Sequence, residues 1–242
     1  MTAAVQKLKD LVDSSRSMVF FGGAGVSTES GIPDFRSVDG LYNQQYQYPP
    51  ETILSHTFFE KNPEEFYRFY RNKMLFPDAQ PNAAHLKLAE LEAAGKLDAV
   101  VTQNIDGLHQ AAGSKTVYEL HGSVHRNYCM KCRQFYGLDF MLEAAGVPRC
   151  PVCGAPMAMN LRADNTFVQD EGWYIAAGRY DDFVRRHEDT PVLYLELGVG
   201  MNTPGIIKYN FWQQVYKNPK AKYACINKGQ SYAPREIADR SI

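Results

Sequence analysis

The stretch Phe20-Phe21-Gly22-Gly23-Ala24-Gly25-Val26-Ser27-Thr28-Glu29-Ser30-Gly31-Ile32-Pro33-Asp34-Phe35-Arg36-Ser37 decides how the rest of the chain is interpreted. The apolar run from Met18 to Phe21 is short and is typical of a buried strand. It ends in glycines, which tolerate positive φ angles and let backbone N–H groups approach a phosphate closely. Ser27, Asp34 and Arg36 then add polar groups in a segment that Pro33 stiffens. We therefore expect a strand followed by a nucleotide-binding loop. The alternative is a turn that needs glycine only for steric reasons and binds no nucleotide.

The loop lacks two features of the common dinucleotide fingerprint. That pattern has a third glycine that opens a helix, and an acidic residue about 20 residues later that binds the ribose hydroxyls. Here Ser27 follows Gly25 without a third glycine in register, and Asp39 comes too early. An ordinary dehydrogenase is therefore disfavoured.

Composition places the chain among ordinary globular proteins. Its 242 residues are 45% hydrophobic and 22% charged, with a net charge of -1, which gives no case for general attraction to nucleic acid or membranes. Residues 1–17 show no signal peptide, and no apolar run approaches the length of a membrane span. Five cysteines without a secretory signal indicate a reducing compartment, so we expect a cytoplasmic protein.

Short apolar runs alternate with helical patterns along the chain. Val5, Leu8, Leu11 and Val12 recur at helical spacing, and further helices are expected at 63–74, from the N-cap Asn82 to Ala94, and after Thr203-Pro204. Further strands are expected at 99–102, 116–120, 192–197 and 223–226. This alternation predicts an α/β fold with a doubly wound, mostly parallel, Rossmann-like sheet.

Four of the cysteines form two closely spaced pairs. Cys129 and Cys132 make one pair, Cys150 and Cys153 the other, with 17 residues between the pairs. Such spacing is typical of a structural zinc site in which two knuckles supply all four ligands. Two disulfides, a redox pair or unpaired core cysteines are the alternatives. Cys225 lies in a predicted strand and is expected to be a core residue.

Polar residues directly follow two of the predicted strands. Gln103, Asn104 and Asp106 come after the strand at 99–102, where open α/β sheets bind ligands, although Asn and Asp could simply cap the next helix. His121 follows the strand at 116–120 and precedes a glycine. A histidine there can be a packed or capping residue, but its ordinary pKa also suits proton transfer at neutral pH.

These motifs together resemble the sirtuins, the family that consumes NAD to remove acyl groups from lysine. Residues 20–37 resemble the first sirtuin signature, 102–109 the second, and His121-Gly122 the His-Gly that follows. The paired cysteines match a zinc module that sirtuins carry inside the nucleotide-binding fold. By this resemblance, residues 1–37, 81–122 and 165–242 form the NAD-binding Rossmann-like domain. The helical insertion 38–80 and the zinc-binding module 123–164 form the small domain.

The resemblance also implies residue roles. His121 is the expected general base and is counted as catalytic together with Asn104, while zinc is expected on the four paired cysteines. NAD is expected as a co-substrate that the protein cleaves at its nicotinamide–ribose bond, with an acyl-lysine protein or peptide as partner. The expected NAD-binding residues are Gly23, Ala24, Gly25, Ser27, Asp34, Phe35, Arg36, Gln103, Asn104, Asp106, Gly198, Gly200, Asn202 and Asn227.

The downstream half departs from the usual sirtuin pattern. Residues 161–173 replace the usual Phe-Gly-Glu near the acyl-lysine channel, and Gly198 to Asn202 replaces the Gly-Thr-Ser phosphate loop. This half resembles the class M sirtuins, which act as protein ADP-ribosyltransferases and lie beside lipoyl-carrier genes. Tyr70 and Lys73 lie roughly where acid-selective sirtuins carry Tyr and Arg, but a lysine on a helix surface is the favoured interpretation.

We therefore expect an NAD-dependent protein-lysine deacylase that transfers the acyl group to ADP-ribose. The alternatives are a mono-ADP-ribosyltransferase acting on a specific protein such as a lipoyl carrier, and an NAD-sensing binding module without turnover.

Overall fold

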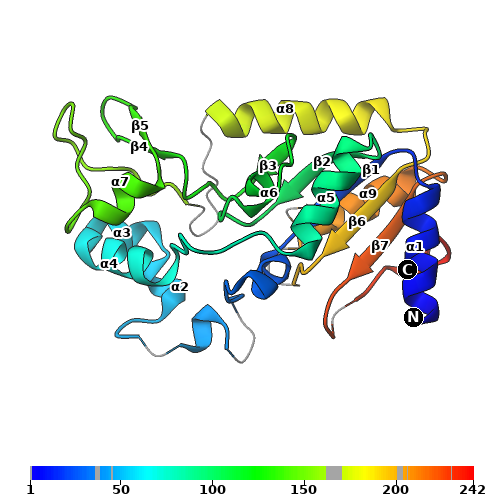
Figure 1. Cartoon of the computed structure of the whole chain (residues 1–242), viewed down its shortest axis with the longest axis horizontal. Helices are drawn as coiled ribbons and strands as arrows, with labels where there is room; N and C mark the ends of the chain where they lie inside the picture. The colour runs from blue at the N-terminus through cyan, green and yellow to red at the C-terminus, as the bar shows by residue number, and fades with distance from the viewer. Residues whose placement is uncertain are drawn as a thin grey trace.

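Five parallel strands form the centre of the molecule in the computed structural model (Figure 1). They lie in the spatial order β3-β2-β1-β6-β7. Their bounds are β1 Met18–Gly22, β2 Leu97–Thr102, β3 Val117–Glu119, β6 Leu193–Leu197 and β7 Lys222–Ile226. The structure describes residues 2–35, 39–44, 46–161, 171–200, 204–205, 207–229 and 231–242. All five predicted strands are present. The strands β2 and β3 follow β1 on one side of it, and the chain then crosses to the other side of β1 to form β6 and β7, so the strand order reverses between β1 and β6.

Helices cover both faces of this sheet (Figure 1). Phe20 and Val100 face one side, where they pack in a core with α1 (Ala3–Ser14) and α5 (Ala83–Ala93). Phe21 and Val101 face the other side, in a core shared with α8 (Glu171–Arg186) and α9 (Lys208–Lys217). A sheet buried on both faces has apolar strands without alternation, which is why the strands are continuous apolar runs. The predicted doubly wound fold is confirmed. None of the helices in the described ranges is long and apolar enough to cross a membrane.

Two helical features differ from the sequence-based expectation. Thr203 lies outside the described residues, and Pro204 lies in a turn rather than at the start of α9. The helix begins at Lys208. Its N-cap residue is Ile207, whose carbonyl oxygen accepts a hydrogen bond from the N–H of Phe211 (2.8 Å). The long helix α8 was missed. Its buried or half-buried apolar residues recur at helical spacing and could have indicated it: Ala176, Tyr180, Phe183 and Val184.

A second hydrophobic core lies away from the sheet. It gathers α2 (Pro50–Ile53), α3 (His56–Lys61), α4 (Pro63–Lys73) and α7 (Leu138–Glu143), together with the antiparallel pair β4 (Asn127–Tyr128) and β5 (Phe135–Tyr136). Phe66 and Phe69 of α4 are buried there with Cys129 and Met157. Residues of the 38–80 insertion and of the cysteine module therefore share one core. The domain boundaries given above stay a prediction.

Asn82 links α5 to the glycine-rich loop. Its side-chain oxygen accepts a hydrogen bond from the N–H of Ala84 (2.9 Å), which caps the helix as predicted, and its amide donates to Val26 O (2.7 Å). His85 accepts from the N–H of Asn82 at Nδ1 (3.2 Å) and its ring meets that of His109, with 4.7 Å between centroids. Burial lowers the pKa of both histidines, and that of His109 falls to about 3 with a further contribution from His85. The pair is therefore neutral at physiological pH.

The buried His109 ring makes the free energy of unfolding depend on pH. Its pKa is lowered from 6.5 to about 3, so between these pH values the unfolded chain binds a proton that the folded chain does not. The free energy of unfolding should therefore fall as the pH drops below 6.5, by about 1.4 kcal/mol per pH unit once the unfolded histidine is protonated. His109→Leu should remove this part of the slope, leaving that of His85. Urea titrations of both proteins from pH 7 to pH 4 measure it, and parallel pH profiles would contradict the assignment.

Candidate active site

A large cleft lies beyond the carboxyl ends of the strands. Its volume is about 1470 Å³, and its walls come from the loops after β1, β2, β6 and β7 together with parts of the second core. In open α/β sheets, ligands bind at this edge where the strand order reverses, which here is between β1 and β6. The fold thus places a cavity at the position where a nucleotide is expected.

Most of the predicted site residues line this cleft. Those that do are Ala24, Gly25, Ser27, Asp34, Phe35, Gln103, Asn104, Asp106, His121, Gly198, Gly200 and Asn227. Arg36 and Asn202 lie outside the described residues. Gly23 lies behind the wall, where its N–H donates to Leu197 O (3.1 Å).

The glycines bring two loop backbones into direct contact. The N–H of Gly25 donates to Gly198 O (3.1 Å), so it is already engaged within the protein. A Cβ on Gly198, whose φ is +66°, would lie 2.6 Å from the carbonyl carbon of Gly25, and a Cβ on Gly23 would lie 2.5 Å from Gly198 O. Sequence reasoning assigned these glycines to ligand approach. That assignment stays a prediction, and the structure adds a second requirement for glycine, because any side chain there would push the β1 and β6 loops apart.

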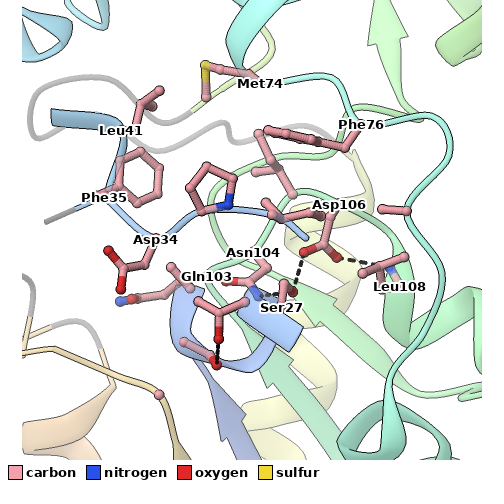
Figure 2. A pocket seen from close by; sticks show the side chains of 18 of the residues that line it. Ser27, Asp34, Phe35, Leu41, Met74, Phe76, Gln103, Asn104, Asp106 and Leu108 are labelled. Carbon is pink, nitrogen blue, oxygen red and sulfur yellow. Dashed lines mark hydrogen bonds between the residues drawn. The ribbon is translucent and has the colours of Figure 1, made fainter. Parts of the chain in front are cut away.

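A chain of hydrogen bonds joins the two loops that follow β1 and β2 (Figure 2). Asn104 Nδ2 donates to Ser27 Oγ (3.0 Å), and Ser27 Oγ donates to Asp106 Oδ2 (2.6 Å). Asp106 Oδ1 accepts from the N–H of Leu108 (2.9 Å), the first residue of α6 (Leu108–Ala111). The capping role considered for Asp106 is therefore real for one carboxylate oxygen, while the other belongs to the Ser27–Asn104 chain.

The opposite side of the cleft is apolar. Figure 2 shows Phe35, Leu41 and Met74 on the side away from Asn104, with Phe76 drawn nearer to Asp106. Sequence reasoning missed Leu41, Met74 and Phe76, because their apolar side chains did not distinguish them from the other apolar residues of the 38–80 insertion. Distant parts of the chain supply further apolar lining residues, namely Leu54, Ile105, Val124, Leu138 and Leu161. The cleft thus offers a polar site and an adjoining apolar surface.

Tyr70 and Lys73 do not form a paired anion site. Tyr70 is buried in the second core, where burial raises its pKa, and it is stacked against Phe66. Lys73 is half-buried at the cleft wall and its Nζ donates to Gln44 Oε1 (2.9 Å).

His121 lies two residues beyond the end of β3 and lines the cleft. Gly122 follows with a φ of +91°, and a Cβ there would lie 2.4 Å from Asn160 O. Because glycine is present, the chain can turn sharply after His121 and approach the 160–161 backbone, where Gly122 and Leu161 form an antiparallel β-bridge. Two residues earlier, the buried Glu119 faces Arg126 (3.5 Å between Oε2 and Nη1), and burial raises the pKa of its carboxyl group. His121 is half-buried and lines the cleft, so a ligand in the cleft could come within its reach, which is the first condition for an acid–base group.

The four paired cysteines form one cluster at the edge of the second core, where Cys132 is exposed. Their sulfur atoms all lie within 4.8 Å of one another. The Sγ atoms of Cys129 and Cys153 are 3.4 Å apart and those of Cys132 and Cys150 are 3.6 Å apart, much longer than the roughly 2 Å of a disulfide. Tetrahedral zinc with Zn–S bonds of about 2.3 Å would hold its sulfurs about 3.8 Å apart. The donor set therefore fits zinc, and four thiolates would leave no open position for chemistry. Cys225 lies in β7, apart from this cluster.

The cluster predicts one structural zinc per chain. Cys150→Ala removes one of four ligands and should release the metal and lower the melting temperature, because three of the four cysteines pack in the second core. Metal analysis of the purified protein by mass spectrometry measures the zinc content. Cys225→Ala is the matched control and should keep its zinc. Equal zinc content in the two variants would contradict the assignment.

The sequence has close relatives among known proteins. A sequence model of the Sir2 family matches residues 23–172. The chain is similar to the NAD-dependent protein deacetylases of Clostridium perfringens, with 58% identity over 156 residues, and of Clostridium acetobutylicum, with 60% over 153 residues. The first match covers 64% of each protein and the second 62%, so the chain matches less than two thirds of the length of these relatives.

Solved structures extend the likeness to the whole fold. A structure from work on the mechanism and regulation of Sir2 enzymes matches with a TM-score of 0.77 and 30% identity, covering 100% of this chain and 92% of that one. A complex of Sir2 with a p53 peptide and NAD+ matches with a TM-score of 0.73 and 34% identity over 100% of this chain and 92% of that one. Since the family model spans more than half of the sequence and the fold agrees along its length, the chain belongs to the Sir2 family.

Proposed function

We propose that the protein is an NAD-dependent protein-lysine deacylase. The observation that carries this proposal is the joining, in one cleft, of the Ser27–Asn104–Asp106 chain, the His121 side chain and an apolar surface. The cleft of about 1470 Å³ exceeds the 300–1,000 Å³ typical of a site for one small molecule, and so suits two substrates. The naming of similar proteins as NAD-dependent protein deacetylases supports it.

We assign NAD to the polar part of the cleft. Gly198, Gly200 and Asn227 lie on the β6–β7 side and would face the phosphates and the adenosine ribose, while Gln103 and Asn104 would face the nicotinamide ribose. Asp34 and Asp106 would orient the carboxamide. The Ser27 hydroxyl holds both Asn104 and Asp106, and it is 1% exposed, so these groups are set before the substrate arrives. Preorganised dipoles and proximity supply much of an enzyme's rate enhancement.

NAD bound in this way supplies an electrophilic ribose carbon when its nicotinamide leaves. The apolar side chains of Phe35, Leu41, Met74 and Phe76 would hold the acyl group of a modified lysine against that carbon and exclude water. A solved relative with a propionylated peptide, 33% identical to this chain with a TM-score of 0.73, supports an acyl-lysine peptide as the partner. The acyl oxygen would take the place of nicotinamide on the ribose carbon. His121 would then take a proton from a neighbouring ribose hydroxyl as that oxygen attacks the acyl carbon, the C–N bond to lysine would break so that the protonated lysine amine leaves, and a water would complete the O-acyl-ADP-ribose.

The role of His121 gives the decisive test. His121→Ala should reduce the formation of O-acyl-ADP-ribose from NAD and an acyl-lysine peptide by about 10²–10⁴-fold, because general-base catalysis typically contributes this much. Chromatography of the products measures both free nicotinamide and O-acyl-ADP-ribose. His187→Ala, just beyond α8, is a control that should leave the rate unchanged. An undiminished rate in His121→Ala would show that another group is the base.

The same incubation with NAD labelled in its ADP-ribose part distinguishes the alternative reaction. A deacylase leaves the label in a small molecule. Label attached to a protein acceptor, a lipoyl carrier included, with no O-acyl-ADP-ribose formed, would overturn the proposal in favour of ADP-ribosyl transfer.

A further inference from the structure

A buried ion pair lies beneath the first turn of α9. Lys208 Nζ contacts Glu196 Oε1, and both side chains are 0% exposed. Glu196 belongs to β6 and points to the face that α9 covers, since its neighbours Leu195 and Leu197 pack on the other face. Lysine and glutamate are almost never fully buried unless they are paired. None of the roles proposed above uses this pair.

The pair is embedded in a small polar network. Tyr223 OH donates to Glu196 Oε2 (2.8 Å), and Cys225 Sγ donates to Oε1 (3.4 Å). Burial, with the Glu196 charge as a further cause, raises the pKa of both Tyr223 and Cys225, so both remain protonated donors. Lys208 Nζ lies 5.9 Å from the centre of the Trp212 ring. The network therefore connects β6, β7 and α9 through one carboxylate.

Stability alone does not explain this arrangement. Lys208 is the first residue of α9, where the helix dipole disfavours a positive charge. A buried ion pair is often no more stabilising than apolar residues of similar volume, because both charges must be desolvated. What the pair does provide is a geometric constraint, since its two side chains hold the start of α9 at one point of β6.

That constraint acts on the wall of the cleft. Glu196 precedes Gly198 by two residues, and Lys208 begins the helix that ends the connection from β6. Gly198 O accepts from the N–H of Gly25 (3.1 Å), Val199 O accepts from Asn227 Nδ2 (2.9 Å), and Gly198 and Gly200 line the cleft. Tying the two ends of a connection together restricts the conformations that its backbone can adopt.

We propose that Glu196 and Lys208 are positioning residues, which clamp the two ends of the β6–α9 connection so that the Gly198–Gly200 backbone faces the phosphates of NAD. This inference rests on the proposed function, because it takes NAD as the ligand of the cleft.

Three variants separate positioning from stability. Lys208→Met breaks the clamp but leaves Glu196 buried without its cation, so its melting temperature should fall. Glu196→Gln combined with Lys208→Met removes both charges, keeps an acceptor for Tyr223 and should restore the melting temperature towards that of the wild type. Lys217→Met changes an exposed lysine at the end of the same helix and is the matched control.

The measurements are the dissociation constant of NAD by calorimetry and the KM and kcat of deacylation. Both variants that lack Lys208 should bind NAD about tenfold more weakly, with kcat at saturating NAD and the KM for the acyl peptide changed by less than about threefold. Lys217→Met should match the wild type. The double variant is decisive even if Lys208→Met fails to fold.

Wild-type NAD affinity in a folded double variant would overturn the positioning role while leaving the proposed function intact. No binding of NAD by the wild-type protein would overturn the proposed function, and this inference with it.

Discussion

The contact between the loops after β1 and β6 is the constraint on which the site depends. The backbones of Gly25 and Gly198 approach so closely that a Cβ on Gly198 would lie 2.6 Å from Gly25. This contact lies where the strand order reverses, and it holds the two loops as one continuous wall of the cleft. Glycine is required because backbone meets backbone there, and no rearrangement of a side chain could relieve the overlap.

The remaining parts of the site are attached to this wall by hydrogen bonds and packing. Ser27, on the β1 loop, holds Asn104 and Asp106 from the β2 loop, and Asn82 binds the β1 loop through Val26 O. The second core brings Leu41 and Met74 to the opposite side, and Phe76 follows Met74 two residues later along the chain. Stretches far apart in the sequence thus build one cavity.

Much of this could be predicted from the chain. Buried parallel strands have a simple pattern because both faces are covered, and all five were found. The cysteine spacing predicted a cluster that the structure brings together, with sulfur distances that exclude disulfides. Helix starts were less predictable. Pro204 has the chemistry of a first helical residue, but it lies in a turn and α9 begins at Lys208. The helix α8 was missed although Tyr180 and Phe183 carry part of its apolar face.

The sequence by itself determined the sheet, the cysteine cluster and most of the polar residues of the cleft, because each depends on local spacing or on residues that directly follow a strand. Only the tertiary structure decided why the glycines are needed, which apolar side chains close the cleft, and that Glu196 meets Lys208. Those facts depend on contacts between segments far apart in the chain, such as Gly25 with Gly198 and Ser27 with Asp106. Such pairings leave no periodic signal in a single sequence, since they arise from how the elements pack.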